Sequence, residues 1–412
     1  MQTFNGYQYL LIDAANHFGL DKETFDKRIQ WATDNIYVLE SLAHLADVKP
    51  RYTKAVMAIR KAQQGKPTGH LVGFDAICSG LQLMSVMTGC YAGAKATGLV
   101  DPDIRADAYT SVTGEMNNIL EGTVSVSRQH AKEAVMTSFY GSKAKPKEIF
   151  GEDTPELAAF YASLMIVGPG ATTLLNVLLD SWQPFALVHE WKLPDGYDAR
   201  IKVMDTTTAR IEVDELDHST FTYEWKENTG KETGLSNVAN VVHSVDAYVL
   251  RSLLRRCNYD AKLIFKVKEL LEYTNDVNSL MGEPISTAKD EKLTYCIEQY
   301  ERSGMVDVVI LPYLKATNVG YLSVQHVSDL LRVVNQMITH HPFEVVTVHD
   351  EFFCHANNMN QLRFHYKEIL ADLADSEVIG DILSQIHGFD GAYTKLSTDL
   401  SSYIRNSNYA LS

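Results

Sequence analysis

Several features that mark particular protein classes are absent from this sequence of 412 residues. Its five cysteines are odd in number and form no CxxC pair, so neither a disulfide framework nor a zinc site is indicated. The N-terminal residues show no basic segment followed by an apolar one, and no apolar run approaches the ~20 residues of a membrane span. We therefore expect an intracellular protein and not a secreted or membrane one.

Basic residues are also scarce. Acidic residues outnumber them 52 to 37, which gives a formal net charge of −15. Proteins that hold duplex DNA alone usually carry an excess of lysine and arginine, because displaced counterions supply much of the affinity. If this protein binds nucleic acid, either its basic groups are concentrated in one channel or something else holds the template.

No internal repeat, low-complexity tract or Gly/Ser linker divides the chain, so we expect interleaved domains. Apolar spacing in the first half predicts helices, with residues 21–32 and 103–120 as examples. Turn signals and alternating residues predict a small β excursion between residues 191 and 225. Helical spacing resumes near residue 237, and a charged stretch at about 257–302 is typical of a solvated insertion.

Two segments far apart in the chain place carboxylates at the ends of apolar strands. Residues 71–74 are a short apolar run typical of a buried strand, which puts Asp75 at its edge. Residues 343–348 predict another strand, and an HD pair at a tight reversal puts Asp350 at a hairpin tip. Two aspartates on adjacent strands can hold two Mg²⁺ ions about 4 Å apart, as nucleotidyl transfer requires. The alternative is that Asp75 caps a helix and Asp350 lies in an ordinary turn.

A third segment, residues 127–142, has the spacing of a helix with its basic residues one turn apart. On one helix, Lys132 and Tyr140 lie about 12 Å apart along the axis, which spans a nucleotide from triphosphate to sugar. Lys132 and Arg128 would then neutralise phosphate charge, and Tyr140 would lie beside the ribose. An amphipathic helix with snorkelling basic side chains and a core tyrosine is the alternative.

Taken together, these motifs resemble the single-subunit, phage-type RNA polymerases of bacteriophages and mitochondria, which are related by fold to DNA polymerase I. In the first family motif a small residue and then SCSGIQ or a similar sequence follow an aspartate, as they do after Asp75. The second motif, R-x-x-x-K through V-M-T-x-x-Y-G-S, matches residues 128–142, and the third is an HD pair in a hairpin, as at Asp350. A histidine that checks the ribose corresponds to His243.

The resemblance implies a helix-rich α+β right-hand fold with palm and fingers, DNA-templated RNA synthesis and two Mg²⁺ ions. The palm would comprise residues 1–103 and 243–412, and the fingers residues 104–242. Because the stretch before the HD motif is longer than the family usually shows, we expect an insertion near residues 257–330.

Roles for individual residues follow from the same resemblance. Related DNA polymerases place a bulky glutamate at the position of Gly80, where it blocks a 2′-hydroxyl, so glycine leaves space for ribose. A tyrosine hydroxyl and an imidazole together can recognise that hydroxyl. The implied catalytic residues are Asp75, Lys132 and Asp350; the implied metal ligands are Asp75, Ala76 and Asp350; and the implied substrate-binding residues are Arg128, Tyr140, His243 and Gly80.

Three residues depart from the family pattern. Ala76 replaces the usual glycine, which still leaves its carbonyl as a metal ligand, and Glu133 stands where a second basic residue is common. Glu351 makes the third motif HDE, which is closer to the DNA polymerases. A family A DNA polymerase therefore stays an alternative. A non-catalytic nucleic-acid-binding subunit of a replication complex is another, although metal carboxylates would repel a nucleic-acid backbone in a protein that only binds.

The resemblance covers nearly the whole chain, but the long N-terminal part of family members has no counterpart. With the acidic charge, this favours a likeness to the large catalytic subunit of the split, two-chain enzymes of some lytic bacteriophages. We then expect DNA template, RNA product, ribonucleoside triphosphates and a second polypeptide as partners, in the cytoplasm of an infected bacterial host. The C-terminal residues 409–412 resemble a family tail that packs toward the active site, and a frayed end is the alternative.

Overall fold

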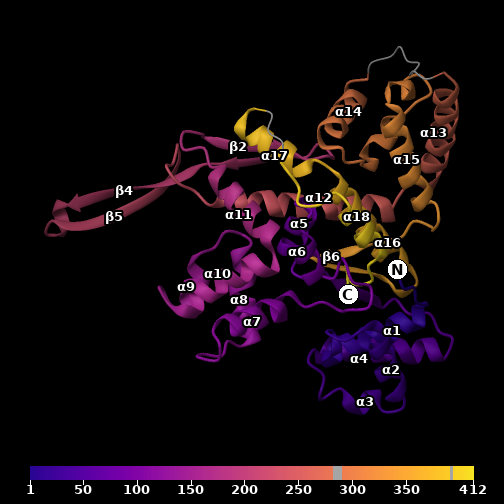
Figure 1. Ribbon diagram of the computed structural model, residues 1–412, viewed down its shortest axis with the longest axis horizontal. Helices are drawn as coiled ribbons and strands as arrows, with labels where there is room; N and C mark the ends of the chain where they lie inside the picture. The colour runs from indigo at the N-terminus through magenta and orange to yellow at the C-terminus, as the bar shows by residue number, and fades with distance from the viewer. Residues whose placement is uncertain (282–289, 390–392) are drawn as a thin grey trace.

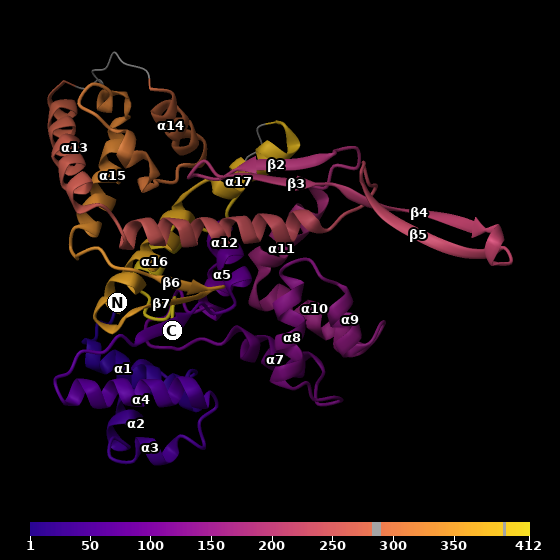
Figure 2. The same ribbon diagram turned by 180° about the vertical axis from the view of Figure 1, so that it is seen from behind.

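The computed structural model describes residues 1–281, 290–389 and 393–412, and Figures 1 and 2 show it from opposite sides. Most of these residues lie in helices, and the strands among them form three small antiparallel sheets. The helix-rich α+β class predicted from the sequence is confirmed.

A three-stranded sheet at the centre joins the two ends of the chain. Its order is β1 (Leu71–Asp75), β7 (Glu351–His355) and β6 (Val346–Val348), and all neighbours are antiparallel. Asp75 lies directly opposite Glu351 in this register. The strand predicted at 71–74 is therefore confirmed, whereas the second one begins only at Val346, three residues later than its apolar run.

The two faces of this sheet differ in their surroundings because strand side chains alternate between them. The face in the main core carries Val72, Phe74, Phe352 and Cys354. The opposite face carries Glu351 and Phe353, which remain partly exposed, and ends at Asp75. The side chains on this second face can meet a ligand.

Four N-terminal helices gather beside the sheet, and both views show them as a group at one end of the molecule (Figures 1 and 2). Helix α1 is almost wholly buried and packs against α2 and α4. A π-helical turn at Asn16–Leu20 contains Gly19 at φ 119°. The helix predicted at residues 21–32 begins only at Phe25, after Thr24 at its N-cap. These helices are α1 (Gly6–Ala15), α2 (Phe25–Asp34), α3 (Leu39–Leu42) and α4 (Lys49–Gln63).

Seven helices follow β1. Figure 2 shows α5 near the centre of the molecule and α7 to α10 as a lobe beside the sheet. The helix predicted from residue 103 begins at Ala108, because the Asp107 side chain accepts hydrogen bonds from the first free backbone N–H groups. The bounds are α5 (Ser79–Met87), α6 (Tyr91–Ala96), α7 (Ala108–Ile119), α8 (Arg128–Ser138), α9 (Ala144–Phe150), α10 (Pro155–Val167) and α11 (Pro169–Asp180). No single helix in the described ranges is long and apolar enough to cross a membrane; α10 and α11 pass that test only as a pair, with a 109° bend between them.

Two β-ribbons confirm the predicted β excursion. The first pairs β2 (Val188–Lys192) with β3 (Asp198–Lys202), and the second pairs β4 (Met204–Val213) with β5 (Ser219–Asn228). The β4–β5 ribbon extends far from the rest of the molecule in both views (Figures 1 and 2). Its side chains are largely exposed as a result.

Long helix α12 (Ser236–Cys257) crosses the middle of the molecule and contacts α5 and α16 (Figure 2). Helix α16 (Met359–Asp375) follows β7 and is largely buried. The chain ends with α17 (Val378–His387) and α18 (Leu400–Asn406). Short 3₁₀ segments occur at Asp214–Leu216, Val308–Tyr313, Val319–Tyr321 and Ala356–Asn358.

The region predicted as an insertion near 257–330 contains α13 (Ala261–Met281) and α14 (Glu291–Ser303) and continues into α15 (Val324–Met337). These helices enclose a second hydrophobic core, separate from the main one, so the charged stretch is amphipathic and not wholly solvated. Residues 282–289 of the predicted insertion lie outside the described residues.

Candidate active site

The two predicted metal aspartates lie at one corner of the central sheet. Asp75 ends β1, and Asp350 occupies the turn between β6 and β7, where the Ala76 N–H donates to the Asp350 carbonyl oxygen at 3.1 Å. His349 adopts a left-handed conformation with φ 55°, which makes the reversal tight. Because Glu351 pairs with Asp75 across the strands, three carboxylates converge on this corner.

The convergence of these carboxylates changes the acidity of Asp75. Its side chain reaches solvent, but protein atoms surround the carboxyl group on its other sides. This desolvation, followed by repulsion from Asp350 and Glu351, raises the pKa of Asp75 to about 7. Arg51 offsets part of the charge because its guanidinium lies 2.9 Å from a Glu351 carboxylate oxygen. Lys22 and Arg105 act to lower the pKa of Asp75, but the burial and the two neighbouring carboxylates outweigh them.

The C-terminal tail packs beside Asp75 and is not frayed. Leu411 forms an isolated antiparallel bridge with Ala76, and the Ser412 N–H donates to the Asp75 carbonyl oxygen at 3.1 Å. Residues 409–412 are buried. The tail therefore fixes the backbone that carries two of the predicted metal ligands.

Gly80 lies in the first turn of α5, immediately beside Tyr140. A Cβ atom at Gly80 would lie 3.1 Å from the Tyr140 Cζ atom and 3.2 Å from its hydroxyl oxygen. Glycine at this position therefore lets the tyrosine ring approach the helix. Gly80 also lines the cavity described below, so open space adjoins the glycine beside the ring.

Tyr140 and His243 stack face to face, with ring centroids 4.5 Å apart and planes 11° from parallel. The pair joins the segment after α8 to helix α12, over a hundred residues later in the chain. Burial raises the pKa of Tyr140 to about 12, so its hydroxyl keeps its proton at neutral pH. A neutral hydroxyl and an imidazole side by side offer both a donor and an acceptor to a sugar.

The predicted helix through Tyr140 is wrong at its end. Helix α8 stops at Ser138, and Gly141 takes φ 88°, a left-handed conformation that ends helices. Tyr140 therefore lies in the turn, and its distance from Lys132 does not follow from a continuous helix. The turn aims the ring at α5 and α12 instead.

A cavity of about 230 Å³ lies between these elements and the β6–β7 turn. Four predicted site residues, Gly80, Tyr140, His243 and Asp350, contribute to its walls. Asp75 adjoins it at the strand edge but does not line it. The cavity is lined by Cys78, Ser79, Gly80, Tyr109, Val135, Met136, Phe139, Tyr140, His243, Asp246, His349 and Asp350.

Arg128 and Lys132 both face the ring of Tyr109, at 5.5 and 5.8 Å from its centroid. Arg128 also forms an ion pair with Asp107 at 2.7 Å, so part of its charge is already neutralised. Neither basic residue lines the cavity, yet Tyr109 does, which places both one side chain away from it.

Tyr109 and Asp246 are among the cavity residues that were not predicted as site residues. Asp246 follows His243 by three positions on α12, so the two share one helix face. Burial and then the charge of Asp350 raise the pKa of Asp246 to about 6. The i, i+3 spacing from His243 was a signal that could have identified it. Tyr109 had no comparable signal, because its position depends on how α7 packs against α8.

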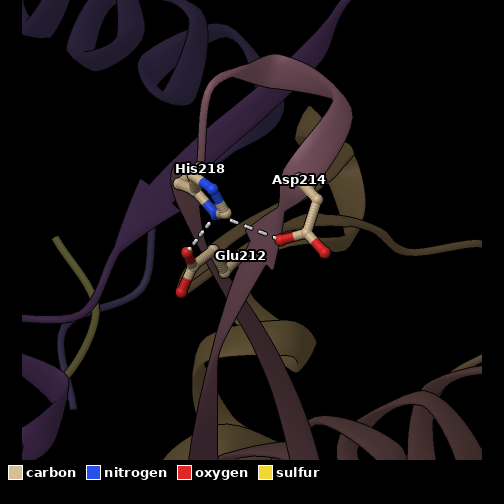
Figure 3. Close-up of side chains that lie close together, drawn as sticks. All are labelled: Glu212, Asp214 and His218. Carbon is tan, nitrogen blue, oxygen red and sulfur yellow. Dashed lines mark ion pairs between the residues drawn. The ribbon is translucent and has the colours of Figure 1, made fainter.

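A different group of possible metal ligands lies at the tip of the β4–β5 ribbon (Figure 3). His218 Nδ1 contacts Glu212 at 2.8 Å and Asp214 at 3.2 Å, and all three side chains are exposed. The histidine already serves as the partner of both carboxylates. Exposed ion pairs of this kind are common without a metal, so we assign none here.

Comparison with known proteins finds similarity to RNA polymerases. Residues 2–146, which include the first two motifs, match the family described as DNA-dependent RNA polymerase. A DNA-directed RNA polymerase of Pseudomonas phage phiKMV is 24% identical over 226 residues, which cover 45% of this chain and 28% of the phage protein. The chain thus aligns with less than a third of that protein's length. The predicted resemblance to the phage-type RNA polymerases is confirmed.

Proposed function

From its resemblance to the phage-type RNA polymerases, we propose that this chain catalyses DNA-dependent RNA synthesis within a right-hand palm-and-fingers fold. Residues 1–103 and 243–412 would form the palm and residues 104–242 the fingers. The observation that carries the proposal is the meeting of Asp75 and Asp350 at one sheet corner, beside a cavity that also contains the Tyr140–His243 stack.

The residues at this corner fit divalent metal ions. Carboxylate and carbonyl oxygens are the ligands that Mg²⁺ prefers, and Asp75, Asp350 and the Ala76 carbonyl supply them. The pKa of Asp75 is raised by burial first and then by the charges of Asp350 and Glu351, and a bound cation would favour the ionised carboxylate against both. Two Mg²⁺ ions, when bound, would lower the pKa of an attacking hydroxyl and stabilise the leaving pyrophosphate.

The cavity would hold the incoming nucleotide. Lys132 and Arg128 bind its triphosphate from the α8 side, where Tyr109 orients both cations. Tyr140 and His243 face its sugar and present the donor and acceptor that select a 2′-hydroxyl. Gly80 lets Tyr140 pack closely and lines the same cavity, where the absence of a bulky side chain leaves room for the ribose.

The two alternatives make different predictions. A family A DNA polymerase would prefer deoxyribonucleotides, and only Glu351 favours it. A non-catalytic subunit would incorporate neither. A second polypeptide and a location in an infected bacterium are further parts of the proposal; the net charge of −15 supports a second chain that helps to hold nucleic acid.

The test is extension of an RNA primer on single-stranded DNA with Mg²⁺, comparing ribonucleotides with deoxyribonucleotides. Asp350→Asn should abolish extension, whereas Asp214→Asn at the exposed ribbon tip is the matched control and should not. Preference for deoxyribonucleotides would identify a DNA polymerase. If no extension occurs, even with candidate partner chains from the same genome, the proposal that this chain is a polymerase is contradicted. Efficient specific transcription from duplex DNA by this chain alone would contradict the need for a second polypeptide.

A further inference from the structure

The most basic stretch of this acidic chain lies on and just after helix α4. Residues 48–74 contain no aspartate or glutamate, although the whole chain has 52 acidic residues. Protein surfaces that only need solubility usually mix both signs of charge. The basic residues of the stretch are Lys49, Arg51, Lys54, Arg60, Lys61 and Lys66.

Three of these residues line a groove of about 410 Å³, which we call the α4 groove. Arg51, Lys54 and Lys61 are three and seven positions apart, so one side of the helix presents all of them. The opposite wall consists of residues 68–71 and Phe353 of β7. The groove therefore lies between α4 and the central sheet.

The charge in the α4 groove is largely free to meet an anion. Lys54 and Lys61 are exposed and form no ion pair within the described residues, and none of the residues that line the groove is acidic. Arg51 shares its charge with Glu351 at 2.9 Å. Arg60, by contrast, pairs with Glu40 at 2.7 Å on another side of the helix. The groove is thus a site of net positive charge in a negative protein.

Phe353 gives the groove an aromatic wall. A Cβ atom at Gly73 would lie 2.3 Å from the Phe353 ring, so the glycine is what allows the ring to lie across the neighbouring strand. The Arg51 guanidinium is 5.6 Å from the centre of that ring. Aromatic rings beside cations are the combination on which bases of a single strand stack while phosphates bind alongside.

The groove continues from the candidate active site. Phe353 lies two residues after Glu351 on the same sheet face, or about 7 Å along the strand. Asp75 ends that face at the carboxylate corner. A strand that passes the corner and follows β7 would reach Phe353 and then the α4 lysines.

We propose that the α4 groove binds the backbone of a single-stranded nucleic acid that enters or leaves the active site. The identity of this ligand rests on the proposed function, whereas the charge and the aromatic wall are properties of the groove itself. Phosphodiester charge complements Arg51, Lys54 and Lys61, and the ring of Phe353 stacks on a base. The groove thereby supplies local positive charge that the net charge of the chain lacks.

The experiment measures binding of fluorescent oligodeoxythymidine and oligouridine by anisotropy over a range of salt concentrations. The variant is Lys54→Gln/Lys61→Gln, which changes two exposed residues outside the catalytic machinery. Lys262→Gln/Lys266→Gln on α13 is the matched control, with the same loss of charge on an exposed helix at the other end of the molecule (Figure 2). Circular dichroism checks that both variants fold.

We expect the α4 variant to bind about tenfold more weakly at low salt, with its salt slope reduced by about 0.7 for each lost phosphate contact. The control should match the unmodified protein. The α4 groove is not a nucleic-acid site if the folded α4 variant keeps the unmodified affinity and salt slope for both oligonucleotides. A larger loss for oligouridine would identify the strand as RNA, and a larger loss for oligodeoxythymidine would identify it as DNA.

Primer extension separates this inference from the proposed function. In an active enzyme, the α4 variant should raise the KM for the primer–template and keep kcat, because the groove lies outside the reacting corner. If the protein extends no primer but loses affinity in the variant, the groove inference holds and the polymerase proposal fails. If the unmodified protein extends primers and the α4 variant keeps its affinity, the polymerase proposal holds and the groove inference fails.

Discussion

Two acidic hairpin tips in the described part of the chain, that of β6–β7 and that of β4–β5, have similar residues but different surroundings. The β6–β7 turn carries Asp350 and Glu351 against the edge of β1, where their charge acts on Asp75 and helps to raise its pKa to about 7. The β4–β5 tip carries Glu212 and Asp214 in solvent, and both are paired with a histidine from the same ribbon. Convergence of carboxylates from separate parts of the chain, and not acidity alone, makes a candidate catalytic site.

The largest expected difference between the tips is in catalysis. Asp75→Asn should reduce primer extension by about a thousandfold or more, because a metal carboxylate is lost. Glu212→Gln removes one carboxylate from the ribbon tip and should leave the rate unchanged. Steady-state extension assays with both variants make the comparison. Equal effects would mean that the β6–β7 corner has no special role.

A second expected effect concerns the tightly packed cavity beside the β6–β7 turn. Gly80→Ala places a Cβ atom 3.1 Å from Tyr140, which should displace the ring from His243 and reduce discrimination between ribo- and deoxyribonucleotides about tenfold. Gly114→Ala on α7 is the control, since a Cβ atom there meets nothing within 4 Å. Competition assays with both nucleotide types measure the ratio. An unchanged ratio in Gly80→Ala would show that the packing of Tyr140 against Gly80 does not contribute to sugar selection.

A smaller effect of Asp75→Asn is expected on the free energy of unfolding in the absence of metal ions. Asp75 has a folded pKa of about 7, above the usual 3.8, so the folded state binds more protons than the unfolded state between these values. Stability then falls as the pH rises from about 4 to 7, and Asp75→Asn should remove this contribution, about 1 kcal/mol after allowance for solvent screening. Urea unfolding with a chelator at pH 5 and pH 7.5 measures it. Asp214→Asn should keep the wild-type pH dependence of stability. If both variants lose it equally, the pH dependence does not come from Asp75.

The smallest effect is expected at the ribbon tip itself. His218→Ala removes the partner of Glu212 and Asp214, but all three side chains are exposed. Exposed ion pairs contribute about 0.5 kcal/mol, so the urea midpoint should hardly move. A loss of several kcal/mol would instead show that this tip has a structural role.

Local patterns predicted the acidic corner well because each half is encoded by neighbouring residues. The apolar run before Asp75 and the HD reversal at Asp350 each specify a strand end, and the resemblance to a polymerase family brought the two together. The stack of Tyr140 on His243 was predicted as a shared role, but its geometry depends on where α8 ends. Gly141 decides that point through its left-handed conformation.

The features that were missed depend on packing between distant segments. Tyr109 reaches the cavity because α7 packs against α8, and the Asp107 cap shifts the start of its helix. The α4 groove exists only because β7, from the other end of the chain, lies beside β1. No spacing within residues 48–74 could have revealed its opposite wall.

The pairing of β1 with β7 has a consequence for how the protein folds. Strand β1 can pair only after β7 has been synthesised, more than 270 residues later. This pairing has a high contact order and closes a very long loop. During translation, the N-terminal helices can form early, while β1 remains an unpaired edge exposed to aggregation. A nascent chain that stops before Asp350 therefore carries Asp75 but cannot form the carboxylate corner.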